Sequence, residues 1–407
     1  MAVIVQKYGG TSLATPARVR RVARRIASQV AAGEQVVAVV SAMGHTTDRL
    51  IGLAHRVNPD PPARELDMLI ANGETISAPL VAMCLQGLGV DAISLTGPQA
   101  GIRTSQHHSR ARIHEIDPAR INQCLERGQV VVVAGFQGAT EEGEITTLGR
   151  GASDLTAVAL AAALKARSCE ILTDVDGILT ADPRVVPDAR LLHYVTYEEI
   201  LEMAAVGARV MQPRSVEIGQ LYGVPIHVRS SFHMRPGTMI VAQVPMENRN
   251  RVRGVAHENE VAKITVLEVP DRPGIAASIF QVLAEHSVSV DVIVQNVSSG
   301  GKTDLTFTVG EADLKRAVAL VNPVAAEIGA KGVSQAGGLA KVSIVGTGML
   351  GTPGIAATMF TTLAAEKVNI EMISTSEIRI TCIVGRTEVA RAVRALHSAF
   401  QLDQVTA

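Results

Sequence analysis

The chain has 407 residues, a length that predicts two or three domains, each large enough to bury its own hydrophobic core. Hydrophobic residues make up 47% of the chain and charged residues 19%, which excludes a disordered polypeptide. The net charge of -1 and the aromatic content of 2% argue against a nucleic-acid-binding surface, because such surfaces are basic and often carry stacking rings. We therefore expect a soluble globular protein that binds no nucleic acid.

The N-terminal stretch predicts no targeting signal, because Lys7 and two glycines interrupt its apolar run after a few residues. No uninterrupted apolar run reaches the ~18 residues that span a bilayer. The four cysteines are far apart without a Cys-x-x-Cys pair, which favours reduced core thiols over disulfides or a zinc site. These features predict a cytoplasmic protein that does not bind membranes.

From residue 1 to about 245, short apolar runs alternate with helical patterns. The expected strands cover residues 3–6, 36–40, 92–95, 130–134, 170–173 and 225–228. The expected helices cover residues 16–32, 62–87, 117–127, 154–167 and 196–205. Apolar strands separated by helices predict an α/β domain with a mainly parallel sheet sandwiched by helices.

The residues after the first expected strand have the character of a phosphate-binding turn. They include Lys7, Gly9, Gly10 and Ser12. A strand end holds the lysine at a fixed point, and glycines let backbone N–H groups approach an anion without a Cβ in the way. Gly-Gly turns are also common in α/β proteins that bind nothing there, so this stretch alone leaves a phosphate site and a plain turn both open.

Polar residues and glycines also follow other expected strands, at the sheet edge where α/β proteins bind their ligands. They lie at residues 41–48, 135–138 and 173–177. A further segment leads into an alanine-rich helix that Ser153 or Asp154 can cap. Arg150, beside the positive end of that helix, predicts a site for a carboxylate or a phosphate.

The polar stretch 246–259 marks the expected junction between a first domain, residues 1–245, and a C-terminal region, residues 246–407. Beyond the junction the sequence repeats, since Pro273 to Ala277 returns as Pro353 to Ala357, an offset of 80 residues (353 − 273). We expect two packed copies of one βαβ-type unit, at about 260–335 and 336–407.

Three patterns in the chain imitate binding motifs. Residues 346–351 satisfy G-x-G-x-x-G, but the first copy of the repeat has no such glycines, which disfavours a dinucleotide site. Residues 174–177 place glycine fourth rather than sixth, which excludes a calcium-binding EF-hand. The histidines between 107 and 114 lack the spacing of a metal site, so we expect an exposed loop and no metal site built from protein ligands.

Six segments occur together and in this order: residues 7–12, 40–48, 73–74, 147–151, 173–177 and 180–184. With them the whole chain resembles the aspartate kinases (aspartokinases) of the amino acid kinase family, and it is most similar to the short form controlled by lysine and threonine. The resemblance implies an amino acid kinase fold followed by two ferredoxin-like βαββαβ ACT domains. It also implies phosphorylation of the side-chain carboxylate of L-aspartate by ATP with Mg2+, the first step towards lysine, threonine and methionine.

The resemblance further implies roles for single residues. Those that would hold the ATP phosphates or line the nucleotide pocket are Lys7, Gly9, Gly10, Ser12, Thr173, Asp174, Asp182, Arg184 and Arg209. Those that would surround aspartate are Ser41, Thr47, Glu74, Gly135, Arg150, Ser153 and Asp154. In this assignment Arg150 binds a substrate carboxylate, Glu74 faces the ammonium group, and Lys7, Arg150 and Asp154 are catalytic.

By the same resemblance, lysine and/or threonine would bind between paired ACT units. The expected contacts are Asp271, Gly274, Ile275, Gln295 and Asn296 in one set, and Thr352, Ile355, Asn369 and Ile370 in the other. Ordinary turns and strand ends explain these residues equally well without a ligand. The ACT domains would also join copies of the chain into a homo-oligomer. Met246 lies where related short-form enzymes begin a separate regulatory subunit, which raises that hypothesis here.

The chain departs from the usual family pattern at Ala152, Leu179, Arg209 and Gln212. Leu179 replaces a tyrosine, which puts one adenosine contact in doubt, and Arg209 replaces a compact ammonium group with a planar fork. Two other functions remain open. A kinase for another amino acid, such as glutamate or acetylglutamate, is disfavoured by the ACT region and the Arg150 motif. A catalytically dead amino-acid sensor is disfavoured because the expected catalytic residues are intact.

Overall fold

The computed structural model describes residues 2–149, 151–208, 211–244, 251–295, 300–349 and 351–404. The chain divides into two compact units. The first comprises Met1–Ile178, Leu191–Ala204 and Arg209–Asn248, and the second comprises Leu179–Arg190, Ala205–Ala208 and Arg249–Ala407. Two short segments that precede residue 245 thus pack with the C-terminal region, where the sequence division had placed them with the first domain.

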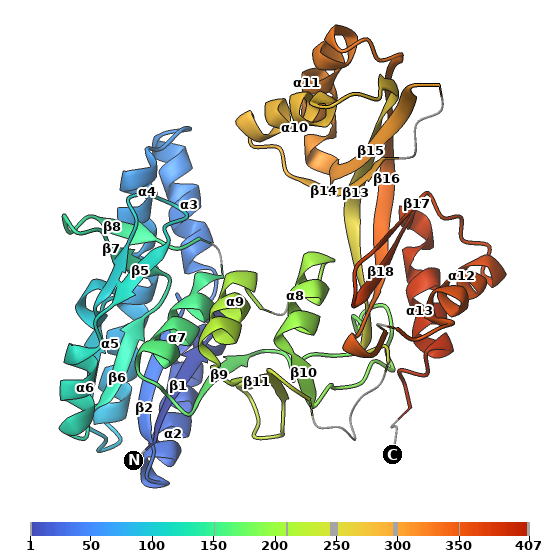
Figure 1. Ribbon diagram of the computed structural model, residues 1–407. Coiled ribbons are helices and arrows are strands. Elements are labelled where there is room, and N and C mark those ends of the chain that lie inside the picture. Colours follow the sequence, from blue (N-terminus) through green and yellow to red (C-terminus); the bar gives the residue numbers. More distant parts are fainter. Residues whose placement is uncertain are drawn as a thin grey trace. The chain divides into compact units, whose positions relative to one another are not determined.

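An eight-stranded sheet forms the centre of the first unit (Figure 1). Its strands are, in spatial order, β10 (Tyr194–Thr196), β12 (Thr238–Val241), β11 (Ile226–Ser230), β9 (Ser168–Thr173), β1 (Val3–Tyr8), β2 (Gln35–Val40), β6 (Val130–Ala134) and β3 (Ala92–Leu95). Every neighbouring pair is parallel except β11 with β12. The mainly parallel sheet predicted from the sequence is confirmed.

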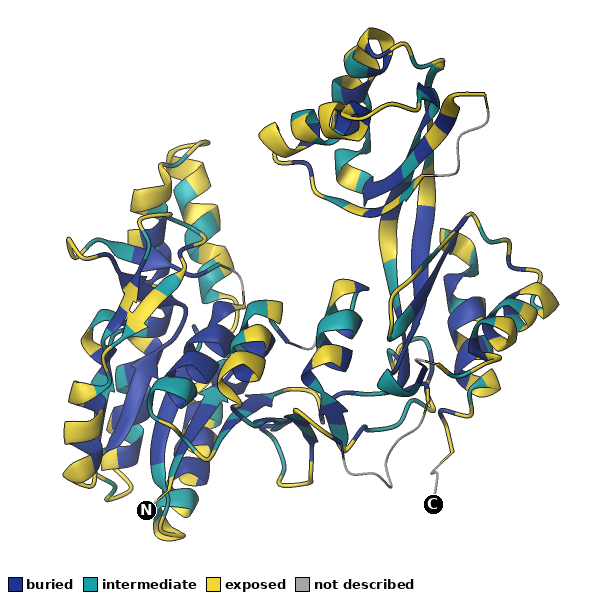
Figure 2. Cartoon of the chain, in the orientation of Figure 1, coloured by how far each residue is buried: buried dark blue, intermediate teal, exposed yellow. Residues whose placement is uncertain are grey.

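Helices cover both faces of this sheet, and the strands between them are buried (Figure 2). On one face, α2 (Pro16–Ala31) and α5 (Asn72–Gln86) pack their apolar residues against alternate strand positions, among them Ile4 and Tyr8 of β1. Because successive residues of a strand point to opposite faces, Lys7 points to the other face. There it meets α7 (Ala152–Ala163), which packs against α9 (Pro213–Tyr222).

The helix predicted at residues 62–87 is two helices, α4 (Ala63–Ile70) and α5, which meet at Ala71. The stretch Ala63–Gln86 is long and apolar enough to span a membrane by length and composition alone. Half of its apolar window is buried inside the molecule, and it carries the buried side chains of Asp67 and Glu74. We therefore interpret it as a pair of core helices.

The first unit also contains elements that were not predicted. A four-stranded sheet has the order β5 (Ile113–Ile116), β4 (Ile102–Thr104), β7 (Gln137–Ala139) and β8 (Ile145–Thr147). The further helices of this unit are α1 (Gly10–Leu13), α3 (Thr46–Val57), α6 (Ala119–Glu126) and α8 (Tyr197–Ala205). Of these four, only α6 and α8 were expected, because α1 and α3 lie in segments read as loops.

The second unit has one antiparallel six-stranded sheet. Its order is β14 (Val290–Gln295), β15 (Lys302–Gly310), β13 (Gly254–Pro270), β16 (Gly332–Val345), β18 (Arg379–Gly385) and β17 (Met372–Thr375). Two pairs of helices, α10 (Ile275–Glu285) with α11 (Leu314–Glu327) and α12 (Ile355–Ala365) with α13 (Val389–Ala399), close two separate cores over it.

The two long strands β13 and β16 each serve both repeats. The start of β13, Gly254–Glu258, pairs with Lys341–Val345 of β16 and completes the second repeat. The second repeat therefore borrows a strand that precedes the first repeat in the chain, which an offset of 80 residues could not reveal. Because β16 is antiparallel to both of its neighbours, the G-x-G-x-x-G segment after it does not belong to a parallel dinucleotide-binding unit.

Equivalent lysines of the two repeats form ion pairs with the opposite repeat. Lys263 Nζ lies 2.7 Å from Glu371 Oε2, and Lys341 pairs with Asp291, the residue 80 positions before Glu371 (371 − 291). Lys341 Nζ also lies 2.8 Å from Glu258 Oε2. Burial acts to lower the pKa of Lys341, but its hydrogen bonds to both carboxylates outweigh that effect and raise the pKa.

We predict that Glu258→Gln and Asp291→Asn together lower the free energy of unfolding of the second unit by about 3 kcal/mol, because they leave the Lys341 ammonium group buried without a counter-charge. Lys341→Met removes the buried charge itself and should cost less. Urea unfolding of the full chain measures both, with the exposed Glu327→Gln on α11 as control. An equal cost for the two changes would contradict the prediction.

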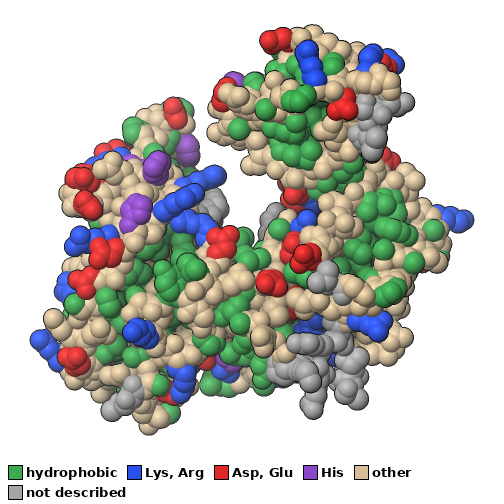
Figure 3. Space-filling model, in the orientation of Figure 1, with side chains coloured by type: hydrophobic (Ala, Val, Ile, Leu, Met, Phe, Trp, Pro, Cys, Tyr) green, Lys and Arg blue, Asp and Glu red, His purple; other side chains and the backbone are tan. Residues whose placement is uncertain are grey.

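Basic and acidic side chains are interspersed on the face of the molecule shown in Figure 3, in keeping with the net charge of -1. All four cysteines are free, and three of them, Cys124, Cys169 and Cys382, are buried.

Candidate active site

Five parallel strands end at one edge of the first unit's sheet and bring most of the predicted site residues together. In spatial order they are β11, β9, β1, β2 and β6. Most of the predicted phosphate and nucleotide residues lie at or just after the ends of β1 and β9. The predicted aspartate residues Ser41 and Gly135 follow β2 and β6. Lys7 belongs to the central strand of the five. The site therefore has two sides that meet at this lysine.

The side chains of Lys7 and Asp154 form an ion pair at the centre of this edge. Lys7 Nζ lies 2.7 Å from Asp154 Oδ1, and the two side chains are 12% and 10% exposed. One residue comes from β1 and the other from the first turn of α7, so the pairing exists only because that helix packs on that strand. The carboxylate fixes the direction of the ammonium group.

The helix α7 begins differently from the prediction. Its N-cap is Gly151, with φ of 75°, and no side chain caps the helix. Ser153 and Asp154 lie inside the first turn instead, so the expectation that one of them caps the helix is wrong. Because glycine adopts this left-handed conformation at little cost, the side chain of Asp154 is left free to face Lys7.

The glycine turn after β1 packs so closely that its shape depends on glycine. A Cβ atom on Gly10 would lie 2.7 Å from the carbonyl oxygen of Ala42 and 3.1 Å from that of Gly44. The backbone N–H of Gly9 donates to Leu172 O of β9 at 3.2 Å, and Gly9 runs alongside the Lys7 ammonium group. This cradle of glycine backbone beside a lysine has the shape and charge that a chain of phosphates requires.

Ser12 and Thr173 meet through a residue that the sequence reasoning missed. Ser12 Oγ donates to Ser231 Oγ at 2.7 Å, and the N–H of Ser231 donates to Thr173 O at 2.8 Å. Ser231 directly follows the end of β11, so its place after an expected strand was the signal that could have found it. Thr173 Oγ1 in turn donates to Asp174 Oδ1 at 3.2 Å.

Other predicted nucleotide residues are not brought to this edge by any described contact. The guanidinium group of Arg184 binds the Asp182 carboxylate, with Nη2 2.7 Å from Oδ2 and Nε 3.0 Å from Oδ1, and both residues belong to the second compact unit. Arg209 and Arg150 lie outside the described residues. Of the unusual positions, Ala152 is buried at the start of α7, and Gln212 caps α9 by accepting from the N–H of Ser215 at 2.9 Å.

Glu74 supplies a buried carboxylate on the aspartate side of the site. Its Oε1 accepts from the N–H of Ala42 at 3.0 Å, next to Ser41. Its Oε2 is buried, with no hydrogen-bond partner among the described residues. Gly73 allows this approach, because a Cβ there would lie 2.7 Å from the Cβ of Ala42 and 3.6 Å from Thr47 Oγ1. Thr47 is thereby placed next to Glu74.

Burial raises the pKa of Glu74 to about 7, and only the Ala42 N–H and the backbone of Glu74 itself counteract this rise. Among the described residues, none supplies the carboxylate with a cationic partner that would favour its charged form. A substrate ammonium group supplies such a partner, because it can donate a charge-assisted hydrogen bond to the unused Oε2.

Gly135 and Ser153 meet beside the ends of β2 and β6. The N–H of Gly135 donates to Val40 O at 3.0 Å, and a Cβ on Gly135 would lie 2.9 Å from Ser153 Oγ. The N–H of Ser41 donates to Tyr8 O at 3.0 Å, which ties this side to β1. The structure therefore brings these predicted aspartate residues to one place.

Among the described parts of the chain, no group of three or more His, Cys, Asp or Glu side chains is placed to hold a metal ion. Mg2+ that arrives with a nucleotide is bound largely by phosphates and water with one or two carboxylates, so it needs no such cage. The glycine cradle at Gly10 and the Lys7 ammonium group fit a nucleoside triphosphate that carries Mg2+ on its phosphates.

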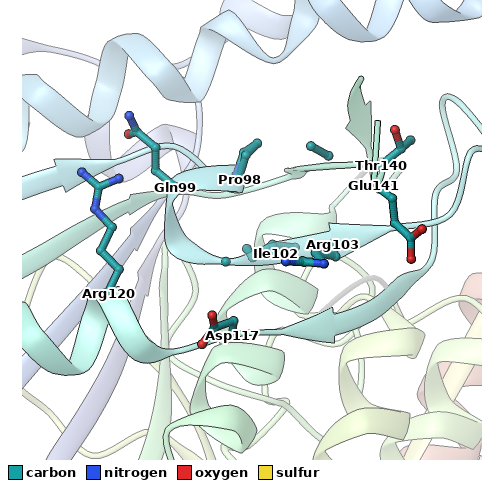
Figure 4. Close-up of a pocket in the computed structure, with 10 residues that line it drawn as sticks. Pro98, Gln99, Ile102, Arg103, Asp117, Arg120, Thr140 and Glu141 are labelled. Carbon is teal, nitrogen blue, oxygen red and sulfur yellow. The ribbon is translucent and has the colours of Figure 1, made fainter. Parts of the chain in front are cut away.

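A separate cavity of about 400 Å³ lies between β4, α6 and the loop after β7 (Figure 4). Its charged lining residues are Arg103, Asp117, Arg120 and Glu141, all of them exposed. Figure 4 shows Arg120 at one end of the cavity and Glu141 at the other. None of the predicted site residues lines it, and we assign it no role.

Comparison with known proteins decides the family. Residues 2–230 match the model of the amino acid kinase family, and residues 263–325 and 342–400 match two ACT domain models. The aspartokinase of Mycolicibacterium smegmatis is 51% identical over 408 residues, covering 99% of this chain and 97% of that protein. The chain belongs to the aspartokinase family. It is therefore an enzyme, a kinase with C-terminal ACT domains.

Solved aspartokinases share the fold. E. coli aspartokinase III in complex with aspartate and ADP (R-state) is 26% identical with a TM-score of 0.81, covering 98% of this chain and 99% of that chain. The same protein in complex with lysine and aspartate (T-state) is 27% identical with a TM-score of 0.75 and the same coverage.

The first helices of the two ACT domains, α10 and α12, begin with the same residue type and backbone conformation. Gly274 and Gly354 are the N-caps of α10 and α12, both with φ of 96°. Ile275 and Ile355 follow them with buried side chains that belong to the two cores, so only their backbone is open to an effector. The remaining predicted effector residues are scattered over both repeats.

In the first repeat Asp271 and Gln295 are exposed, and Asn296 lies outside the described residues. In the second repeat Thr352 Oγ1 donates to Gly348 O at 2.9 Å, and Asn369 Nδ2 donates to Glu371 Oε1 at 3.1 Å. Ile370 packs against the second core.

We predict that Lys7→Ala lowers turnover by orders of magnitude with only a modest loss of aspartate affinity, because the lysine neutralises charge at the transferring phosphate. Steady-state kinetics with varied ATP and aspartate measure this, with Lys315→Ala, an exposed residue of α11, as control. Near-normal turnover of Lys7→Ala would contradict the assignment.

We also predict that kcat/KM for aspartate falls as the pH drops through about 7, since Glu74 then takes up a proton and can no longer pair with the ammonium group. Glu74→Gln should lower kcat/KM and flatten this limb of the pH profile, whereas Glu65→Gln on the exposed side of α4 should leave it unchanged. The same apparent pKa in Glu74→Gln would refute the role of Glu74.

Proposed function

We propose that the chain transfers the γ-phosphoryl group of ATP to the side-chain carboxylate of L-aspartate, forming 4-phospho-L-aspartate. The observation that carries the proposal is the Lys7–Asp154 pair, at the sheet edge where Gly10 packs against Ala42 and Glu74 accepts from the N–H of Ala42. Transfer of a phosphoryl group from a nucleotide to an amino acid needs a phosphate site, a cation and an ammonium site close together.

The proposed chemistry requires no general base. A side-chain carboxylate with an ordinary pKa of about 3.9 is already ionised at neutral pH. Its main barrier is repulsion from the phosphates, so the enzyme has to neutralise charge and hold the two reactants in line. Lys7 and the N–H groups of the glycine turn would hold the phosphates, and Mg2+ bound with ATP would supply further positive charge. Arg150 would bind a carboxylate of aspartate.

The environment of Glu74 also supports aspartate over acetylated substrates. N-acetylglutamate has no ammonium group, so it would leave the buried Oε2 of Glu74 without a partner. An unpaired buried polar group typically costs about 1–3 kcal/mol, which disfavours such a ligand. An amino acid with a free ammonium group satisfies the same atom.

The test is trapping of the acyl phosphate with hydroxylamine. Purified chain, ATP and Mg2+ are incubated with aspartate, glutamate or N-acetylglutamate, and the hydroxamate is measured with and without lysine and threonine. Hydroxamate formed from aspartate alone supports the proposal. Activity only with another acid identifies a kinase for that substrate, and no activity with any of them identifies an amino-acid sensor.

We propose further that lysine and/or threonine inhibit the enzyme through the ACT domains, that copies of the chain associate through these domains, and that the enzyme acts in the cytoplasm as the first step towards lysine, threonine and methionine. The repeated N-caps Gly274 and Gly354 support the effector proposal, because each leaves helix N–H groups free for an amino-acid carboxylate. E. coli aspartokinase III, with the same fold, has been solved with lysine bound.

Whether a regulatory subunit starts at Met246, which lies outside the described residues, is a separate hypothesis. A single full-length band from the native gene would count against it.

We predict that Asp271→Ala and Thr352→Ala each raise the effector concentration for half-inhibition at least about tenfold, because a coupling of about 1–3 kcal/mol depends on the lost contacts. Inhibition curves with lysine, threonine and both together measure the effect. The exposed Glu327→Gln on α11 serves as control. Unchanged inhibition in both variants would remove these residues from the effector sites.

A further inference from the structure

Asp67 of α4 is a fully buried carboxylate, with 0% of the residue exposed. It accepts four hydrogen bonds from three residues. His108 Nδ1 lies 3.0 Å and the N–H of Ser109 lies 2.9 Å from Oδ2. The N–H of Thr147 lies 3.0 Å from Oδ2, and Thr147 Oγ1 lies 2.6 Å from Oδ1. A buried charge with this many donors specifies the positions of all of them.

The donors come from two segments that are far apart in the sequence. His108 and Ser109 lie in the loop between β4 and β5, whereas Thr147 ends β8. The two segments are also joined directly, since the N–H of Ala111 donates to Thr147 O at 2.9 Å. The expectation of a simply exposed histidine loop is therefore wrong for His108, whose side chain is 20% exposed and paired with Asp67.

A second charged residue, Arg214 of α9, forms hydrogen bonds to the same two segments. Arg214 Nη1 donates to Leu148 O at 2.9 Å, and its Nη2 donates to Ala111 O at 3.1 Å. Thr147 and Leu148 are thus fixed from both sides, by a carboxylate and a guanidinium group. Two residues further along the chain comes Arg150, followed by the N-cap Gly151 and by Asp154 in the first turn of α7.

We propose that Asp67 is a positioning residue for aspartate binding, which acts by fixing the Thr147–Leu148 segment from which Arg150 follows. Among the described residues, Asp67 forms no hydrogen bond to a predicted substrate residue, and it acts through the backbone of residues 147–148 that leads to them. This inference rests on the proposed function, because it assigns Arg150 to a substrate carboxylate. Nucleotide binding uses the other side of the site, so the effect of Asp67 is specific to aspartate.

The test is a set of variants of the full chain in steady-state kinetics. Asp67→Asn keeps the shape of the side chain but removes its negative charge, so the hydrogen bonds from Ser109 and Thr147 lose their charge assistance and weaken. We expect the KM for aspartate to rise about tenfold or more, because a displacement of about 1 Å in a positioning group costs up to about 100-fold. The KM for ATP should stay within about twofold of the wild type.

Thr147→Val removes only the hydroxyl donor and tests the same link if Asp67→Asn fails to fold. It should also raise the KM for aspartate selectively, and the double variant should be little worse than Asp67→Asn alone. The control is Asp60→Asn, the same substitution at an exposed position between α3 and α4, which should change nothing.

The outcomes separate this inference from the proposed function. A wild-type chain without activity towards aspartate overturns both. An active wild type with Asp67→Asn and Thr147→Val that only melt earlier, or that raise both KM values equally, overturns the positioning role while the proposed function stands. A selective rise in the KM for aspartate in both variants supports the inference.

Discussion

The active-site edge depends on the ion pair between Lys7 and Asp154. The two residues are 147 positions apart (154 − 7) and come 2.7 Å together because α7 packs on the face of the sheet to which Lys7 points. A lysine at a strand end has a flexible stem, and without the carboxylate its charge would have no fixed direction. The pairing sets where a phosphoryl group can be neutralised, and the glycine cradle and Glu74 lie at the same sheet edge, where both contact Ala42.

Close backbone packing is the second requirement of the site. A Cβ on Gly10, Gly73 or Gly135 would come within 2.9 Å of a neighbouring atom of the site. Without these side chains, the ends of β1 and β6 and the first turn of α5 can approach their neighbours closely, and Glu74 of that turn is buried, with 4% of the residue exposed. The raised pKa of Glu74 follows from that packing, so the same glycines that shape the site also tune its acid–base behaviour.

In the second unit the two repeats are joined by shared backbone and by charge. β13 and β16 run through both halves, so neither repeat can shift along its strands without its neighbour. Lys263 and Lys341 each pair with a carboxylate of the opposite repeat. An effector that moves the segment of Asn369 and Glu371 would therefore disturb the ion pair between Glu371 and Lys263 of the first repeat. Through this ion pair, an amino acid bound to one ACT domain can affect the other.

The sequence by itself determined the mainly parallel sheet and the repeat, because apolar periodicity is a local property of the chain, and most of the site residues it predicted lie at one edge of that sheet. It did not identify Asp67, Arg214 or Ser231, whose roles arise from hydrogen bonds to residues 41 to 219 positions away. It placed the helix cap at Ser153 or Asp154, since propensity favours those residues, whereas in the structure Gly151 is the N-cap and Asp154 pairs with Lys7. Only the tertiary structure decided these points, because burial and long-range pairing set the surroundings that give each side chain its function.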